Sequence, residues 1–142
     1  EDNNIHDIID NHDLYNVPEY HDFVLKHGSS TDKLHVYLHN PHKIEHALDN
    51  NTPINIWDRK DILNKYKEHP TILGKMLKSS QFIPEVAKYG DSTLVKKVYD
   101  SHYRNLKYSE IDDLNRFHNY IKENRPEELE HNKDMINQLP IN

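Results

Sequence analysis

The chain has 142 residues, of which 35% are hydrophobic and 30% charged, and its formal net charge is -6. This length suits one ordinary domain, so we expect a single helical domain over residues 1–142. The absence of cysteine excludes disulfides, thiolate zinc sites, iron–sulfur clusters and Cys-nucleophile chemistry. A mean hydropathy of -1.00 predicts a thin core, and no apolar run is long enough to cross a membrane.

The charge is unevenly distributed along the chain. Residues 1–32 carry one Lys and eight acidic residues, residues 33–107 carry 13 Lys and Arg with eight acidic residues, and residues 108–142 carry four with eight. Two interpretations stay open, because charge balance bears on partners and solubility and not on fold. The basic middle is either a surface shielded by acidic flanks or a set of lysine-rich helix faces exposed to water.

Helix start and stop signals recur along the whole chain while period-two alternation is scarce, which favours an all-α fold. A first amphipathic segment at residues 3–12 carries Ile5, Ile8 and Ile9 at helical spacing. Later helices are expected to start at or near Pro18, Ser30, Asp58, Pro84, Ser92 and a capping box at Ser109. Breaks are expected at Gly28, Pro41, residues 50–56, Pro70, Gly90 and residues 124–126, before a last helix over residues 127–138.

We therefore predict about seven or eight short helices, with antiparallel neighbours because most connections are short. Both chain ends are expected to be helical and packed. The apolar face of the C-terminal segment is provided by Leu129, Met135 and Ile136.

Trp57 is the only tryptophan and follows the expected loop at residues 50–56, where Asn and Pro disfavour a helix. One interpretation is that the indole anchors this loop on the helices. The other is that it is an exposed anchor for a binding partner.

Three stretches align as a weak internal repeat, beginning at Asn40, His69 and Tyr89. Each has a breaker, a short helix with an apolar pair four residues apart, and a polar stop; the pairs are Ile44/Leu48, Leu73/Leu77 and Leu94/Val98. Over about residues 39–101 this sequence pattern resembles the variant leucine-rich or HEAT-like helical repeats of some bacterial and bacteriophage proteins. The resemblance implies a curved α-solenoid used for binding, in which the three pairs are buried along one shared seam. An irregular helical bundle is the alternative.

Histidines form the strongest local cluster, with His35, His39, His42 and His46 at spacings of four, three and four. Because Pro41 interrupts a single face, they would act as two pairs on adjoining helices, each able to share zinc, nickel or copper. The alternative is that a chain with 12 histidines produces such spacings by chance. We expect no metal to be needed for folding and no resident cofactor.

Enzymatic motifs are weak. Residues 42–46 match His-x-x-Glu-His, the inverted zinc-peptidase pattern, but only formally, because the motif also requires a third ligand and a substrate cleft. With only three glycines, none of them grouped, the chain has no phosphate-binding loop. We expect no enzyme.

A nucleic-acid interface is the alternative that the basic middle offers. Its residues are Lys88, Lys96, Lys97, Arg104 and Lys107, interleaved with tyrosines that could stack on unpaired bases. The main expectation is a non-enzymatic interaction module that binds a protein partner through a helical face, in the cytoplasm, or in the host cytoplasm if the chain is viral. Because the sequence begins at Glu1 and not at Met, we expect a processed product or an excised fragment.

Overall fold

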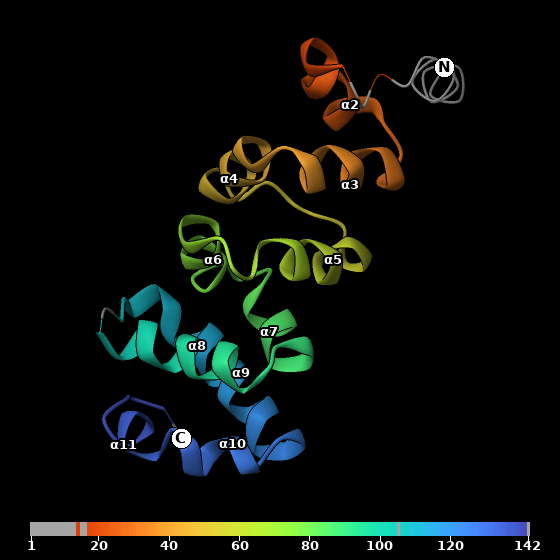
Figure 1. The fold of residues 1–142 in the computed structure, drawn as a ribbon. Coiled ribbons are helices and arrows are strands. Elements are labelled where there is room, and N and C mark those ends of the chain that lie inside the picture. Colours follow the sequence, from red (N-terminus) through yellow and green to blue (C-terminus); the bar gives the residue numbers. More distant parts are fainter. Residues whose placement is uncertain (1–13, 15–16, 105, 142) are drawn as a thin grey trace. The chain divides into compact units, whose positions relative to one another are not determined.

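The computed structural model describes residues 14, 17–104 and 106–141 (Figure 1). These residues form ten α-helices and no strand, which confirms the all-α prediction and exceeds the expected seven or eight helices. The predicted face of Ile5, Ile8 and Ile9 lies outside the described residues. The chain divides into two compact units, residues 1–65 and 66–142, and each is considered by itself below. That residues 1–142 form one domain stays a prediction.

The helix boundaries of the first unit agree closely with the expected ones. A 3₁₀ turn, Pro18–Tyr20, leads into α2 (His21–His27), which ends at Gly28. α3 (Ser30–His39) and α4 (Pro41–Asp49) follow, and α4 begins with Pro41 in its first turn, where the missing N–H costs no hydrogen bond. α2 packs against α3, and α3 packs against α4. After a loop, α5 (Ile56–Tyr66) crosses the boundary between the units by one residue.

The core of the first unit is small and aliphatic. Val24, Val36, Ile44 and Ile62 are fully buried. Leu14 and Leu25 pack against Val24 of α2 and Val36 of α3.

The described residues of the second unit form six α-helices and a 3₁₀ turn. They are α6 (Pro70–Met76), α7 (Ile83–Tyr89), α8 (Ser92–Arg104), the turn Tyr108–Glu110, α9 (Ile111–Asn124), α10 (Glu127–His131) and α11 (Lys133–Ile136). α7 packs against both α8 and α9, and α10 and α11 pack against α8. The core of the second unit contains large aromatic side chains. Phe82 and Tyr99 are fully buried, and Phe117 is nearly so.

At two of the expected helix starts, near Asp58 and Ser92, the residue that caps the helix lies one to three residues earlier. α5 begins before Asp58, and the Asn55 side chain accepts a 2.8 Å hydrogen bond from the Trp57 N–H. α8 begins at Ser92, but the neighbouring Asp91 carboxylate caps it by accepting from the Leu94 N–H at 2.9 Å. Two adjacent polar residues can each cap a helix, and the sequence alone does not tell which one is used.

The capping box predicted at Ser109 does not form. Ser109 lies inside the 3₁₀ turn, and Glu110, which precedes α9, makes no side-chain cap. The Glu110 carboxylate instead lies 2.9 Å from the Lys78 Nζ. An ion pair therefore joins this turn to the turn that follows α6.

The C-terminal segment is helical and packed, as expected for this end, but it is two helices and not one. The break falls at Asn132, whose Nδ2 donates to the Glu128 carbonyl at 2.8 Å. Of the apolar side chains in this segment, Leu139 is the buried one, while Met135 and Ile136 are partly exposed.

A common turn precedes α3, α6 and α8. At each, the N-cap side chain accepts from the backbone N–H three residues later: Ser29 from Asp32, His69 from Ile72, and Asp91 from Leu94. The residue before the cap is glycine at α3 and α8. An added Cβ would lie 2.6 Å from the Val24 carbonyl oxygen at Gly28 and 2.7 Å from that of Val86 at Gly90. Close approach of the preceding helix end therefore excludes a side chain at both positions.

This common turn does not begin at the same residues as the predicted repeat. Asn40, with which the first predicted stretch begins, makes no side-chain cap at α4, whereas Ser29 does so at α3. The three apolar pairs Ile44/Leu48, Leu73/Leu77 and Leu94/Val98 are all buried, as expected. That they line one seam, and that the chain belongs with the variant leucine-rich or HEAT-like repeats, stay predictions.

Candidate functional site

Trp57 lies at the first turn of α5 with 83% of its surface exposed, beside Ile56 at 54%. The interpretation that the indole packs the loop onto the helices is therefore wrong. Ile54 fills that role instead, since it is only 4% exposed and its carbonyl accepts from the Arg59 Nε at 3.0 Å. Because Ile54 points inward, the start of α5 leaves Ile56 and Trp57 in water.

The predicted nucleic-acid residues are all exposed, but Lys96 and Lys97 of α8 line different grooves. Adjacent helical residues point about 100° apart, which separates them. Lys96 shares its groove with carboxylates of Asp100, Glu130 and Asp134. Lys97 shares the other with Glu68 and Asp91.

Two of the remaining basic residues share an ion pair or a cavity with a carboxylate. Arg104 donates from Nε to the Asp100 Oδ1 at 3.0 Å, one helical turn away. Lys88 lies on α7 beside the Asp113 carboxylate in a cavity described below. That these five residues form a nucleic-acid interface stays a prediction.

A cavity of about 230 Å³ lies between α7 and α9. Its apolar lining comes from Ile83, Pro84, Ala87, Phe117 and Tyr120, and its polar lining from Ser80, Lys88, Asp113 and Arg116. The Asp113 carboxylate accepts from the Ser80 Oγ at 3.0 Å and lies 3.5 Å from the Arg116 guanidinium. The volume suits one apolar side chain of a partner. Sequence reasoning missed this cavity, because its walls come from helices distant along the chain.

The histidine cluster is divided between two helices, as Pro41 predicted. On α3 the His35 and His39 rings lie side by side, with centroids 4.5 Å apart. Burial, and secondly the neighbouring His39, hold the pKa of His35 below its usual value. On α4 the His46 ring lies 3.1 Å from the Asn50 Nδ2. Among the residues that the structure describes, no group of three or more His, Cys, Asp or Glu could hold a metal ion, which counts against the zinc-peptidase match.

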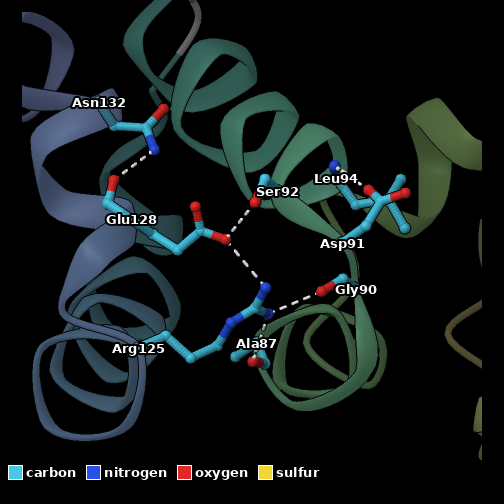
Figure 2. Close-up of polar contacts among 8 residues, drawn as sticks. All are labelled: Ala87, Gly90, Asp91, Ser92, Leu94, Arg125, Glu128 and Asn132. Carbon is cyan, nitrogen blue, oxygen red and sulfur yellow. Dashed lines mark hydrogen bonds and ion pairs between the residues drawn. The ribbon is translucent and has the colours of Figure 1, made fainter.

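Three groups of buried or partly buried polar side chains lie in the second unit, and none was predicted. Figure 2 shows Arg125 donating to the Ala87 and Gly90 carbonyls at the end of α7, at 3.1 and 2.7 Å. The same guanidinium donates to the Glu128 Oε2 at 2.9 Å, which also accepts from the Ser92 Oγ at 2.8 Å. Glu128 is only 2% exposed, so Arg125 and Ser92 balance a carboxylate inside the core.

The other two groups contain buried histidines. His102 donates from Nδ1 to the Val98 carbonyl of its own helix at 2.8 Å, because a carbonyl can only accept. The neutral ring then has no proton on Nε2, which lies 3.3 Å from the Glu110 Oε2 without a hydrogen bond. The Tyr99 hydroxyl lies 2.8 Å from the His118 Nδ1 and joins α8 to α9. Burial lowers the pKa of both histidines and raises that of Tyr99. An isolated His or Tyr in the sequence gives no signal for these contacts.

Within the described residues, no helix is long and apolar enough to span a bilayer. Comparison with known proteins finds no matching family model, no similar curated protein and no similar solved structure.

Proposed function

We propose that this chain is a non-enzymatic interaction module that binds a protein partner, with Trp57 as its anchor. The exposure of Trp57 is the observation that carries the proposal. Aromatic residues that bury their large apolar surface on binding dominate the energetics of protein interfaces. Ile56 extends the same apolar surface, and the Asn55 cap holds both side chains at a fixed helix start.

Binding to nucleic acid is the weaker alternative. Phosphate recognition requires basic side chains that act together on one backbone. Here Lys96 and Lys97 lie in separate grooves with carboxylates, and Arg104 is paired with Asp100. These arrangements favour a protein partner. We also propose a cytoplasmic setting, and the repeat resemblance suggests a bacterial or bacteriophage protein.

Photo-crosslinking tests the anchor directly. A photoreactive phenylalanine analogue replaces Trp57 in the full chain, and a second protein carries it at Tyr108, which is 92% exposed and lies in the other unit. We expect a discrete crosslinked partner from position 57 and not from position 108. Equal crosslinking from both positions would count against Trp57 as the anchor.

A salt titration with DNA and RNA separates the two functions. We expect no binding at low salt. Affinity that falls steeply as salt rises, and that weakens in Lys96→Ala and Lys97→Ala, would favour the nucleic-acid alternative.

A further inference from the structure

The cavity between α7 and α9 is lined by one face of each helix. On α7 the lining residues Pro84, Ala87 and Lys88 have the spacing that places side chains on a single helical face. The lining residues of α9 have the same spacing, extended by one turn, and are Asp113, Arg116, Phe117 and Tyr120. Because α7 packs against α9, these two faces bound the cavity from both sides.

Apolar and charged residues of the lining differ in burial. Ala87 is 1% exposed and Phe117 is 2% exposed. Lys88 is exposed, and 77% of the Arg116 side chain is accessible to water. An apolar group can therefore enter among buried side chains while a charged group attached to it stays beside the two exposed cations.

The charges of the lining do not balance. The Asp113 carboxylate accepts from the Ser80 Oγ at 3.0 Å and lies 3.5 Å from the Arg116 guanidinium, so Asp113 and Arg116 compensate each other. Lys88 forms no hydrogen bond or ion pair with any residue that the structure describes. The cavity therefore has one uncompensated positive charge at its edge, which attracts an anionic group.

The volume indicates what kind of apolar group fits. The cavity measures about 230 Å³, which is below the roughly 300–1,000 Å³ of pockets that enclose free drug-sized ligands. It is larger than a cavity of about 150 Å³ that holds a benzene ring. One Phe or Leu side chain projecting from a protein segment fits this space, and side chains that fill such pockets dominate the energetics of interfaces.

We propose that this cavity binds a protein segment in which a phenylalanine or leucine lies next to an acidic residue. The apolar side chain enters between Ala87 and Phe117, and the neighbouring carboxylate pairs with Lys88. The proposal rests on the proposed function only in that the occupant is a protein, because the cavity uses none of the residues at the start of α5.

Peptide titrations of the isotope-labelled full chain, followed by nuclear magnetic resonance, test the proposal. The probe is acetyl-Gly-Asp-Phe-Asp-Gly-amide. One comparison peptide has Ala in place of Phe, and the other has Lys in place of both Asp residues. We expect saturable shifts at Ala87, Lys88 and Phe117 with the probe, and binding about tenfold weaker or more without the Phe anchor. The lysine peptide should also bind more weakly than the probe.

Two exposed lysines provide a matched pair of variants. Lys88→Met keeps most of the apolar stem and removes the charge, so it should weaken binding of the probe by about two- to fivefold, as for one exposed charge pair. Lys97→Met is the control, since Lys97 is equally exposed but lines another groove, and should leave binding unchanged. Trp57→Ala should also leave it unchanged, which separates a failure here from a failure of the proposed function.

Three results would overturn the proposal: shifts that do not saturate, equal binding of the aspartate and lysine peptides, or equal losses in Lys88→Met and Lys97→Met. Phenylacetate carries the same ring and a carboxylate without a peptide chain. If free phenylacetate binds as tightly as the probe, the cavity takes a small carboxylate and not a protein segment, and the proposal is wrong.

Discussion

Polar side chains join distant segments at the surface of both units, and in the second unit they also do so in the core. In the first, the Lys43 Nζ donates to the Asp22 Oδ1 at 2.9 Å, and the Asn55 Nδ2 to the Ser30 Oγ at 3.0 Å, both exposed to solvent. In the second, Arg125 and Ser92 converge on a Glu128 that is 2% exposed.

This difference teaches where stability should be sensitive to a single polar substitution. Exposed ion pairs contribute only about 0–1 kcal/mol, because water and salt screen them. A buried carboxylate that loses its partner is left uncompensated and costs several times more. The first unit should therefore depend on apolar packing and helix caps, and the second on its buried contacts as well.

The largest expected effect comes from Arg125. Arg125→Met removes three hydrogen bonds and leaves Glu128 buried without its charge partner, so we expect a loss of about 3–5 kcal/mol in the free energy of unfolding. Chemical denaturation followed by circular dichroism measures it. Arg116→Met, which breaks an exposed pair, should cost less than about 1 kcal/mol. Similar losses in both variants would remove the distinction between buried and exposed pairs.

Adding Glu128→Leu to Arg125→Met sharpens this test. The double variant no longer buries an unpaired charge, so it should recover part of the lost stability. A double variant as unstable as the sum of the two single variants would mean that the two side chains act separately.

Apolar packing should matter in both units. Leu77→Ala in the second unit and Ile44→Ala in the first each empty a buried position, at 6% and 0% exposure, and should each cost about 2–5 kcal/mol. Thermal and chemical denaturation measure both. Tolerance of one substitution and not of the other would show that one unit has much the looser core.

The buried histidines of the second unit should make stability depend on pH, and His35 of the first unit, whose pKa is also lowered, adds in the same direction. Burial lowers the pKa of His102 and His118 below the unfolded value of 6.5, so the unfolded chain binds more protons than the folded chain between the two pKa values. Stability should therefore fall as the pH drops below 6.5 and change little above it. Denaturation at pH 8 and pH 5 measures this slope, and His118→Gln should reduce it. Stability that rises on acidification would contradict the buried neutral histidines.

Helix caps provide a smaller test, in the first unit. Ser29→Ala removes the capping box of α3, in which Ser29 and Asp32 bond reciprocally, and should cost about 0.5–2 kcal/mol. Ser109→Ala is the control, since Ser109 caps no helix, and should change stability by less than about 0.5 kcal/mol. A larger loss at Ser109 would mean that its predicted capping box forms in solution.

The smallest expected effect is a gain. Gly74 lies exposed inside α6, and an added Cβ would meet no atom within 4 Å. Gly74→Ala should therefore raise stability by about 0.5–1 kcal/mol, because alanine loses less backbone entropy in a helix. A melting curve that moves downward would indicate that the backbone at this position is not helical in solution.

Much of the fold was predictable because proline and glycine act locally. Pro18, Gly28, Pro41, Pro70 and Gly90 all lie at the predicted helix boundaries. Asp58, Ser92 and Ser109 were misassigned, because several neighbouring polar residues compete for each cap and the rest of the fold decides between them.

The candidate sites were less predictable. The spacing of His35 and His39 gave the pair, but only the structure gave their 4.5 Å separation. Trp57 is exposed because Ile54, and not Ile56, takes the inward position. The alternation of these two isoleucines in the sequence does not tell which one is buried. The contacts of Arg125 reach segments 35 and 38 residues away, and no local pattern carries that information.

The glycine turns before α3 and α8 bear on how such a chain could be lengthened. Residues 24–31 read Val-Leu-Lys-His-Gly-Ser-Ser-Thr, and residues 86–93 read Val-Ala-Lys-Tyr-Gly-Asp-Ser-Thr. The glycine, which admits no side chain, and the cap that follows it are local to each turn, so copying these residues copies the end of one helix and the capped start of the next. A designer adding a further helix pair should therefore transplant these eight residues and choose the flanking apolar residues afterwards.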